Sequence, residues 1–121
     1  MKGVPQIDSI WGDLGIKDEP VKLSNTKGTI SFARSGPNTR SNQLFINLAD
    51  NARLDESDYN DVKGFPAFGK VVEGMEIVES INSEYKQEPN QDSISVKGNR
   101  YLTKNFPNLD YIISTEIVEK K

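Results

Sequence analysis

Residues 28–48 read GTISFARSGPNTRSNQLFINL, and this stretch decides the fold that the sequence predicts. It holds two runs of alternating side-chain character, joined by a Gly-Pro-Asn-Thr loop at residues 36–39. Successive side chains of a strand point to opposite faces, so each run predicts a strand with two different faces. In the loop, Pro37 fixes φ, and Asn38 and Thr39 can bond their own backbone, which is typical of a tight connection.

The two faces of the second run differ in chemistry. Leu44, Ile46 and Leu48 form an aliphatic face, which we expect to pack into a core. The other face carries the amide of Gln43 beside the aromatic ring of Phe45. An amide next to an aromatic ring suits a surface that binds a peptide backbone together with one apolar side chain.

Composition limits the classes of function that the chain can have. Its 121 residues suffice for one domain with a single core. There are 15 basic and 18 acidic residues, and no basic cluster stands out, so we expect no nucleic-acid partner. The absence of histidine and cysteine excludes Ser-His and Cys-His nucleophilic sites, histidine or cysteine zinc sites, and disulfides.

The sequence shows no membrane or export signal. No apolar run approaches the roughly 20 residues that a membrane span needs. Residues 1–5 lack the apolar core of a signal peptide. We therefore expect a soluble chain without membrane association, most simply a monomer, and the sequence does not specify its compartment.

The rest of the chain predicts weaker elements. Residues 1–19 read as a loop-like lead-in, in which we expect Trp11 to cover part of the core. Residues 67–72 predict a strand, and residues 94–105 predict a weak helix. Residues 111–118 are rich in β-branched side chains and predict a final strand.

A further helix is expected after Gly74. Its apolar residues fall close to helical spacing, which indicates core packing. They are Met75, Ile77, Val78, Ile81 and Tyr85.

The acidic stretch 49–66 leaves two interpretations open. Carboxylates gather in it, and carboxylates are ligands of calcium. Their spacing does not fit an EF-hand loop and Gly64 is misplaced for one, so we favour a solvated loop. The carboxylates are those of Asp55, Glu56, Asp58 and Asp61.

Several separate blocks resemble the cyclophilin-type peptidyl-prolyl isomerases. The first comprises the Gly-Thr-Ile-Ser-Phe-Ala strand, the Gly-Pro-Asn-Thr loop and the Ser-x-Gln-Leu-Phe-Ile-Asn strand of residues 28–47. The second is Phe-Gly-Lys-Val-Val-Glu-Gly-Met at residues 68–75, and the third is the Asn-Phe-Pro-x-Leu-Asp-Tyr-Ile tail at residues 105–112. We take residues 20–118 as the matching region of a single domain that spans residues 1–121.

The resemblance implies a mainly β fold with two helices, namely a cyclophilin-like barrel that is incomplete at its N-terminus. It implies isomerisation of Xaa-Pro bonds in proline-containing peptides and unfolded proteins, with no metal and no cofactor. By the same resemblance, Phe45 forms the floor of a proline pocket, Gln43 bonds the substrate backbone, and Leu54 forms a wall. Ala33 and Arg34 lie along the peptide, and Phe65 stands where the family has a histidine.

The chain departs from the family pattern upstream. The family carries a Phe-His-Arg segment and a Phe-x-x-Gln-x-Gly segment, and this sequence contains neither. Residues 1–5 resemble the family residues that come directly after the second segment. The family's catalytic arginine is therefore absent, so we assign no catalytic residue, and the spacing of Arg34 and Arg40 does not favour either as a substitute.

Three explanations of this departure compete: a truncated gene product, a native split that needs a partner segment, and a degenerate copy. We expect a fragment. Besides an isomerase, the sequence permits a module that binds proline-containing peptides without turning them over, or an inactive piece.

Overall fold

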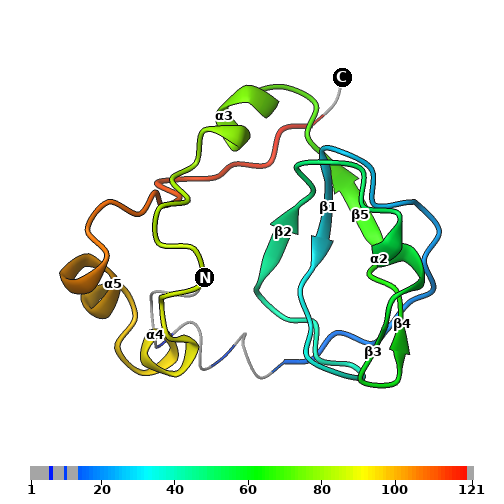
Figure 1. Cartoon of the computed structure of the whole chain (residues 1–121), viewed down its shortest axis with the longest axis horizontal. Coiled ribbons are helices and arrows are strands. Elements are labelled where there is room, and N and C mark those ends of the chain that lie inside the picture. The colour runs from blue at the N-terminus through cyan, green and yellow to red at the C-terminus, as the bar shows by residue number, and fades with distance from the viewer. Residues whose placement is uncertain (1–5, 7–9, 11–13, 120–121) are drawn as a thin grey trace.

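The structure is a computed structural model that describes residues 6, 10 and 14–119 (Figure 1). In chain order its elements are β1 (Thr29–Phe32), β2 (Leu44–Ile46), α2 (Arg53–Glu56), β3 (Asp58–Tyr59), β4 (Val62–Lys63), β5 (Ala67–Lys70), α3 (Met75–Glu79), α4 (Gln91–Lys97) and α5 (Asn99–Asn105). Gln6 and Ile10 have helical backbone within the expected lead-in. Trp11 and residues 1–5 lie outside the described residues.

The centre of the fold is a three-stranded antiparallel sheet in the order β2-β1-β5. The register sets Ile30 opposite Ile46 and Phe32 opposite Leu44, while Ser31 lies opposite Phe45. Directly opposed residues share a face, so the apolar side chains of both strands gather on one face and Phe45 lies on the other. Among the described residues this sheet is open, with β2 and β5 at its edges, and the expected closure into a barrel is not seen.

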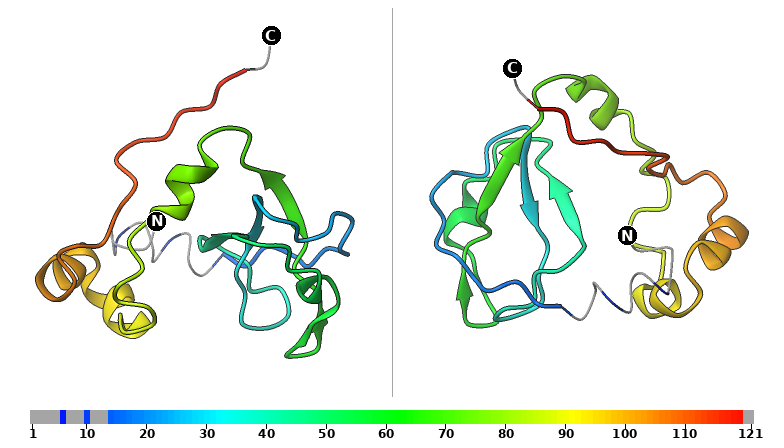
Figure 2. Two further views of the ribbon diagram at one scale, coloured as in Figure 1. Left: turned by 45° about the horizontal axis from the view of Figure 1, so that its top comes forward. Right: turned by 180° about the vertical axis from the view of Figure 1, so that it is seen from behind.

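The other elements are arranged on either side of this sheet. A two-stranded hairpin, β3–β4, and α2 lie beside β5, whereas α4 and α5 lie beyond β2 (Figures 1 and 2). The C-terminal segment runs from α5 back past α3, where Asn82 N donates to Asp110 Oδ2 at 2.7 Å. None of the described helices packs broadly against the sheet.

The interior is polar rather than aliphatic. The buried side chains at the sheet include Asn25, Thr29, Ser31 and Asn47, and Ala67 is a small apolar residue among them. The expectation that the aliphatic face of the second strand packs into a core is wrong, because Leu44 and Leu48 are each 55% exposed. The physical reason is that no described helix covers that face.

Several expected elements are shorter than predicted or differ in kind. The helix expected after Gly74 stops at Glu79, and Ile77 and Ile81 are exposed rather than packed in a core. The single helix expected at residues 94–105 is two helices that meet at Gly98.

Two expectations about irregular and extended segments are wrong. The acidic stretch 49–66 contains α2 and the β3–β4 hairpin, so it is not simply a loop. Residues 111–118 form no strand and are exposed along their whole length, because the β-branched side chains find no neighbouring strand there. Among the described residues no helix combines the length and the apolar character that crossing a bilayer requires.

Candidate functional site

The loop between the two signature strands is held by Thr39. Its Oγ1 accepts hydrogen bonds from Ser35 N and Gly36 N, both at 2.9 Å, and donates to Gly36 O at 2.8 Å. Asn38 has φ of 54°, a left-handed conformation that asparagine tolerates better than most residues. At the base of the loop Ala33 N donates to Gln43 O at 3.0 Å. The loop therefore has a defined conformation, which fixes the positions of residues 33 and 43 at its two ends.

A network of buried side chains lies on the face of the sheet that carries Phe45. Asn25 Oδ1 accepts from Ser31 Oγ at 2.8 Å and from Asn47 Nδ2 at 3.0 Å. Asn47 Nδ2 also donates to Thr29 Oγ1 at 2.9 Å, and Asn47 Oδ1 accepts from Asn51 Nδ2 at 2.9 Å. Buried polar groups are stable when they are hydrogen-bonded, so this network can serve as an interior.

Asp55 extends the network into α2. Its Oδ1 accepts from Asn25 N at 2.8 Å and from Asn25 Nδ2 at 2.7 Å, and its Oδ2 accepts from Ser24 Oγ. Partial burial of the carboxylate opposes its ionisation, but the hydrogen bonds from Ser24 and Asn25 outweigh burial and lower the pKa of Asp55. The ionised carboxylate therefore fastens α2 to the segment that precedes β1.

Phe65 is held by its backbone from two sides. Its N–H donates to Leu54 O at 2.8 Å, and its carbonyl accepts from Asn25 Nδ2 at 2.7 Å. The ring meets Phe45 edge to face, with centroids 5.9 Å apart and an interplanar angle of 75°. This arrangement is a favoured one for aromatic pairs, and both rings are half-buried, so each keeps some accessible surface.

Arg34 completes an aromatic and cationic cluster with these rings. Its guanidinium carbon lies 4.2 Å from the centroid of Phe65, within the range of a cation–π interaction. Its Nη2 donates to Val62 O at 3.0 Å and to Gly64 O. The two carbonyls and the ring hold the charge of Arg34 beside the pair of phenylalanines.

Gln43 is placed differently from the other expected site residues. Its main chain pairs with Ala33, but its Nε2 donates to Gln91 Oε1 of α4 at 3.0 Å. Side-chain contacts join Phe45 to Phe65 and Phe65 to Arg34, and a backbone hydrogen bond joins Phe65 to Leu54. The backbone of Ala33 pairs with Gln43 rather than with this cluster. The amide of Gln43 contacts α4 instead, and it is half-buried.

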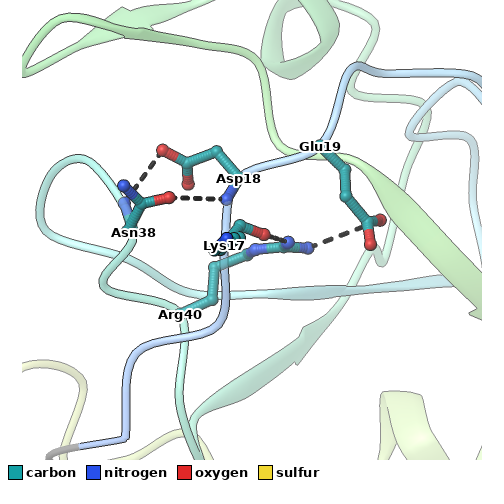
Figure 3. Close-up of polar contacts among 5 residues, drawn as sticks. All are labelled: Lys17, Asp18, Glu19, Asn38 and Arg40. Carbon is teal, nitrogen blue, oxygen red and sulfur yellow. Dashed lines mark hydrogen bonds and ion pairs between the residues drawn. The ribbon is translucent and has the colours of Figure 1, made fainter.

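Arg40 lies away from this cluster. The residue is buried at 3% exposure, and its guanidinium lies 5.8 Å from the centroid of Phe32, which is on the face opposite Phe45. Nη2 donates to Lys17 O, and Nη1 lies 3.9 Å from Glu19 Oε2 (Figure 3). Of the two arginines in residues 33–43, Arg34 therefore lies over Phe65, whereas Arg40 lies near Phe32.

The segment that holds Arg40 is itself fixed to the signature loop. Asp18 N donates to Asn38 Oδ1 at 2.8 Å, and Asn38 N donates to Asp18 Oδ2 at 2.9 Å (Figure 3). Ile16 N donates to Arg40 O at 2.7 Å in an isolated antiparallel bridge. These contacts attach residues 16–19 to the loop.

Sequence reasoning missed the residues that support the site. Asn25 and Asn47 are the centre of the buried network, and nothing in the alternation of residues 28–48 distinguishes a buried asparagine from an exposed one. The one available signal was position, since Asn47 shares the strand face of Phe45. The part of the chain that the structure describes contains no cluster of three or more acidic side chains placed to hold a metal ion.

Comparison with known proteins identifies the family. The model of the family described as "Cyclophilin type peptidyl-prolyl cis-trans isomerase/CLD" matches residues 3–100. This chain belongs to that family.

Relatives from bacteria and a fungus agree with the family match. The chain is 45% identical over 60 residues to the peptidyl-prolyl cis-trans isomerase of Acinetobacter baylyi, and 48% identical over 61 residues to peptidyl-prolyl cis-trans isomerase A of Dickeya dadantii. These matches cover 49% and 50% of this chain and 31% of each relative. A third, the peptidyl-prolyl cis-trans isomerase-like 3 of Rhizopus delemar, is 33% identical over 91 residues, covering 70% of this chain and 49% of the relative. The chain thus spans 31% to 49% of the length of these relatives.

Proposed function

We propose that this chain acts as a peptidyl-prolyl cis-trans isomerase that assists protein folding. The observation that carries the proposal is the cluster of Phe45, Phe65 and Arg34 on one face of the sheet, in a chain of the cyclophilin family. An apolar surface beside a cation offers what a proline-containing segment needs for binding.

The reaction needs no nucleophile and no cofactor. Rotation about a peptide bond faces a barrier of about 18–20 kcal/mol, because resonance across the C–N bond is lost. Xaa-Pro bonds populate both isomers and interconvert over about 10–100 s without a catalyst. A protein accelerates this by holding the peptide on both sides of the bond and by stabilising the twisted amide with fixed polar groups.

Each expected site residue has a proposed role in that scheme. The rings of Phe45 and Phe65 contact the proline, with Leu54 beside them, and the main chain of Ala33 pairs with the substrate backbone. Arg34 places a positive charge next to the rings, where it can donate to the prolyl nitrogen as that atom loses conjugation. Gln43 bonds the substrate when its amide leaves Gln91.

A second candidate is a module that binds proline-containing peptides without turning them over. The observation that favours it is that the guanidinium of Arg34 already donates to Val62 O and Gly64 O and lies over the ring of Phe65. Under either function we propose that the open sheet corresponds to part of the family barrel. We also propose that the partners are proline-containing peptides and unfolded proteins, and that the chain acts as a single copy without nucleic acid.

Exchange NMR on an Xaa-Pro peptide with catalytic amounts of the chain tests the proposal. We expect exchange between cis and trans signals to accelerate, and Phe45→Ala to reduce the acceleration by about tenfold or more, equivalent to roughly 1.4 kcal/mol of transition-state stabilisation. Phe68→Ala is the matched control, because Phe68 stacks on Phe32 on the other face of the sheet. Shifts without exchange would support the binding module, and neither shifts nor exchange would overturn both.

A further inference from the structure

The two C-terminal helices form a small unit of their own. Gly98 joins α4 and α5 with φ of 57° and ψ of −139°, a combination in which glycine is strongly favoured. Gly98 N donates to Ile94 O at 2.8 Å, and Gly98 O accepts from Tyr101 N at 3.1 Å. Ile94 of α4 is buried, at 7% exposure. The sharp turn at Gly98 brings the end of α4 next to the exposed side of α5.

A cavity of about 660 Å³ lies between these helices, and its lining carries positive charge only. Its lining residues are Val96, Lys97, Arg100, Tyr101, Lys104 and Asn105. No acidic residue occurs in residues 93–109, although the whole chain has net charge −3. A second cavity, which Asp55, Glu56 and Lys63 line in part, carries both signs of charge.

The three cations have no acidic partner among the described residues. The ion pairs between described residues join Lys27 to Glu79 and Arg40 to Glu19, and neither involves this cavity. The side chains of Lys97, Arg100 and Lys104 are exposed. Like charges that lie together without counter-charges repel one another, so an anionic ligand would gain from all three.

We propose that this cavity binds an acidic peptide segment in extended conformation. Arg100 and Lys104 are four residues apart on α5, which sets their Cβ atoms about 5–6 Å apart. In an extended peptide the side chains of one face repeat every two residues, or about 6.6–6.8 Å, so alternate carboxylates match this spacing. Lys97 at the end of α4 extends the row of cations.

The neutral residues of the lining suit a peptide as well. Tyr101 Oη accepts from Asn90 N at 3.2 Å, which leaves its hydroxyl hydrogen to donate to a peptide carbonyl. Val96 is 74% exposed and offers apolar contact to a side chain of the peptide.

A nucleic acid fits this site less well than a peptide. Its row of phosphates would continue beyond the three cations onto the surface of a chain with 18 acidic residues.

Fluorescence anisotropy on the full chain tests this proposal with a labelled peptide of alternating Glu and Ala that contains no proline. The peptide does not engage the proposed isomerase site, so the two proposals succeed or fail separately. We expect the Glu peptide to bind more tightly than its Gln counterpart. We also expect its affinity to fall several-fold as salt rises from about 50 to 200 mM, because screening weakens exposed ion pairs.

Charge reversal locates the site. The triple variant Lys97→Glu, Arg100→Glu, Lys104→Glu should weaken binding by about tenfold or more, since exposed pairs contribute up to about 1 kcal/mol each. The control Lys22→Glu, Lys63→Glu, Lys70→Glu makes the same change of net charge at other exposed positions and should change affinity less than about twofold.

Chemical-shift mapping on the unaltered chain gives a result that does not depend on the variants folding. We expect the Glu peptide to shift the amide signals of residues 96–105 and to leave those of β1 unchanged. Equal affinity for the Glu and Gln peptides, equal weakening in both triple variants, or shifts elsewhere would overturn the proposal. Tighter binding of duplex DNA or of phosphatidylserine vesicles than of the peptide would also overturn it.

Discussion

Asn25 and Asn47 hold together the face of the sheet on which Phe45 lies. They are 0% and 2% exposed, and each amide both donates and accepts hydrogen bonds. A buried donor or acceptor that loses its partner suffers the full desolvation cost, whereas a well-paired one contributes modestly. The stability of this interior therefore depends on complete pairing more than on the number of bonds.

Replacement of Asn47 by alanine tests that dependence. Asn47→Ala leaves Asn51 Nδ2 without its acceptor and removes one donor to Asn25 Oδ1. We expect the free energy of unfolding to fall by about 1–3 kcal/mol in urea denaturation. Asn99→Ala, at an exposed position of α5, should change it by no more than about 0.5 kcal/mol. Equal effects of the two substitutions would show that the network is not a stabilising interior.

Asp55 makes stability depend on pH in a definite direction. Burial acts against the carboxylate, but hydrogen bonds from Ser24 and Asn25 hold its pKa in the folded chain below the ordinary value of 3.8. A lowered pKa contributes stability at pH values above the unfolded pKa, and this contribution is lost as pH falls through the folded pKa. We expect Asp55→Asn to remove that part of the acid sensitivity.

Urea denaturation midpoints measured from pH 6 to pH 2 check this expectation. In the unaltered chain the midpoint should fall as pH drops below about 4. The curve of Asp55→Asn should lie lower at pH 6 and be flatter below pH 4. Asp58→Asn removes an exposed carboxylate from β3 and should keep the shape of the original curve. A curve for Asp55→Asn parallel to the original would rule out this role of Asp55.

The alternation in residues 28–48 predicts which side chains share a face, and the register confirms that grouping. It could not predict which face is buried, because burial of a face depends on which other elements of the fold pack against it. Leu44 and Leu48 read as core residues from their chemistry alone, and both are exposed. Asn47 reads as a surface residue from its chemistry, and it is buried by partners as far away in sequence as Asn25.

At the scale of elements, Gly64, which follows β4, lets the chain pack closely against α2 because glycine has no Cβ. Its φ is +76°, and a Cβ added there would meet Asp55 O and Val21 Cγ2 at distances too short for real atoms. Gly64 O also accepts from Arg34, so the same residue helps to place the cation of the candidate site. Any side chain at this position has to displace α2 or residue 21.

Gly64→Ala should therefore destabilise the chain by about 2 kcal/mol or more, through backbone strain and steric overlap together. Gly69→Ala is the matched control within β5, where an added Cβ has no heavy atom within 4 Å. There the substitution should be neutral or slightly stabilising. Thermal unfolding followed by circular dichroism measures both variants, and similar melting temperatures would contradict the close packing around Gly64.

The sequence predicted an element well where hydrogen bonds within the segment determine its conformation. It predicted an element poorly where contacts with distant segments determine the conformation. In the Gly-Pro-Asn-Thr loop, Thr39 bonds the loop backbone as expected, whereas the side-chain oxygen of Asn38 accepts from Asp18 N instead. Residues 111–118 have β-branched side chains but no strand partner, so intrinsic preference alone did not produce a strand. The break at Gly98 was visible in the sequence as a glycine inside a weak helical pattern.

At the scale of the whole molecule, the sheet has one polar, well-bonded face and one apolar face that is largely uncovered. Phe68 is 53% exposed and stacks on Phe32 at 4.8 Å, next to the exposed Leu44. Exposed apolar patches of this kind limit solubility, and the net charge of −3 opposes association only weakly. The family could be predicted from the sequence, but the difference in exposure between the two faces of the sheet could not.

The uncovered face should set the solubility of the chain. Leu44→Lys with Leu48→Lys places charge on that face, and the double variant should remain free of light-scattering aggregates at concentrations where the unaltered chain associates. Val72→Lys with Ile113→Lys makes the same change at residues 86% and 88% exposed but outside the sheet face, and should improve solubility less. The added charge is identical in the two double variants, and only its place on the surface differs. An equal gain in solubility would therefore show that net charge, and not the uncovered face, limits the solubility of the chain.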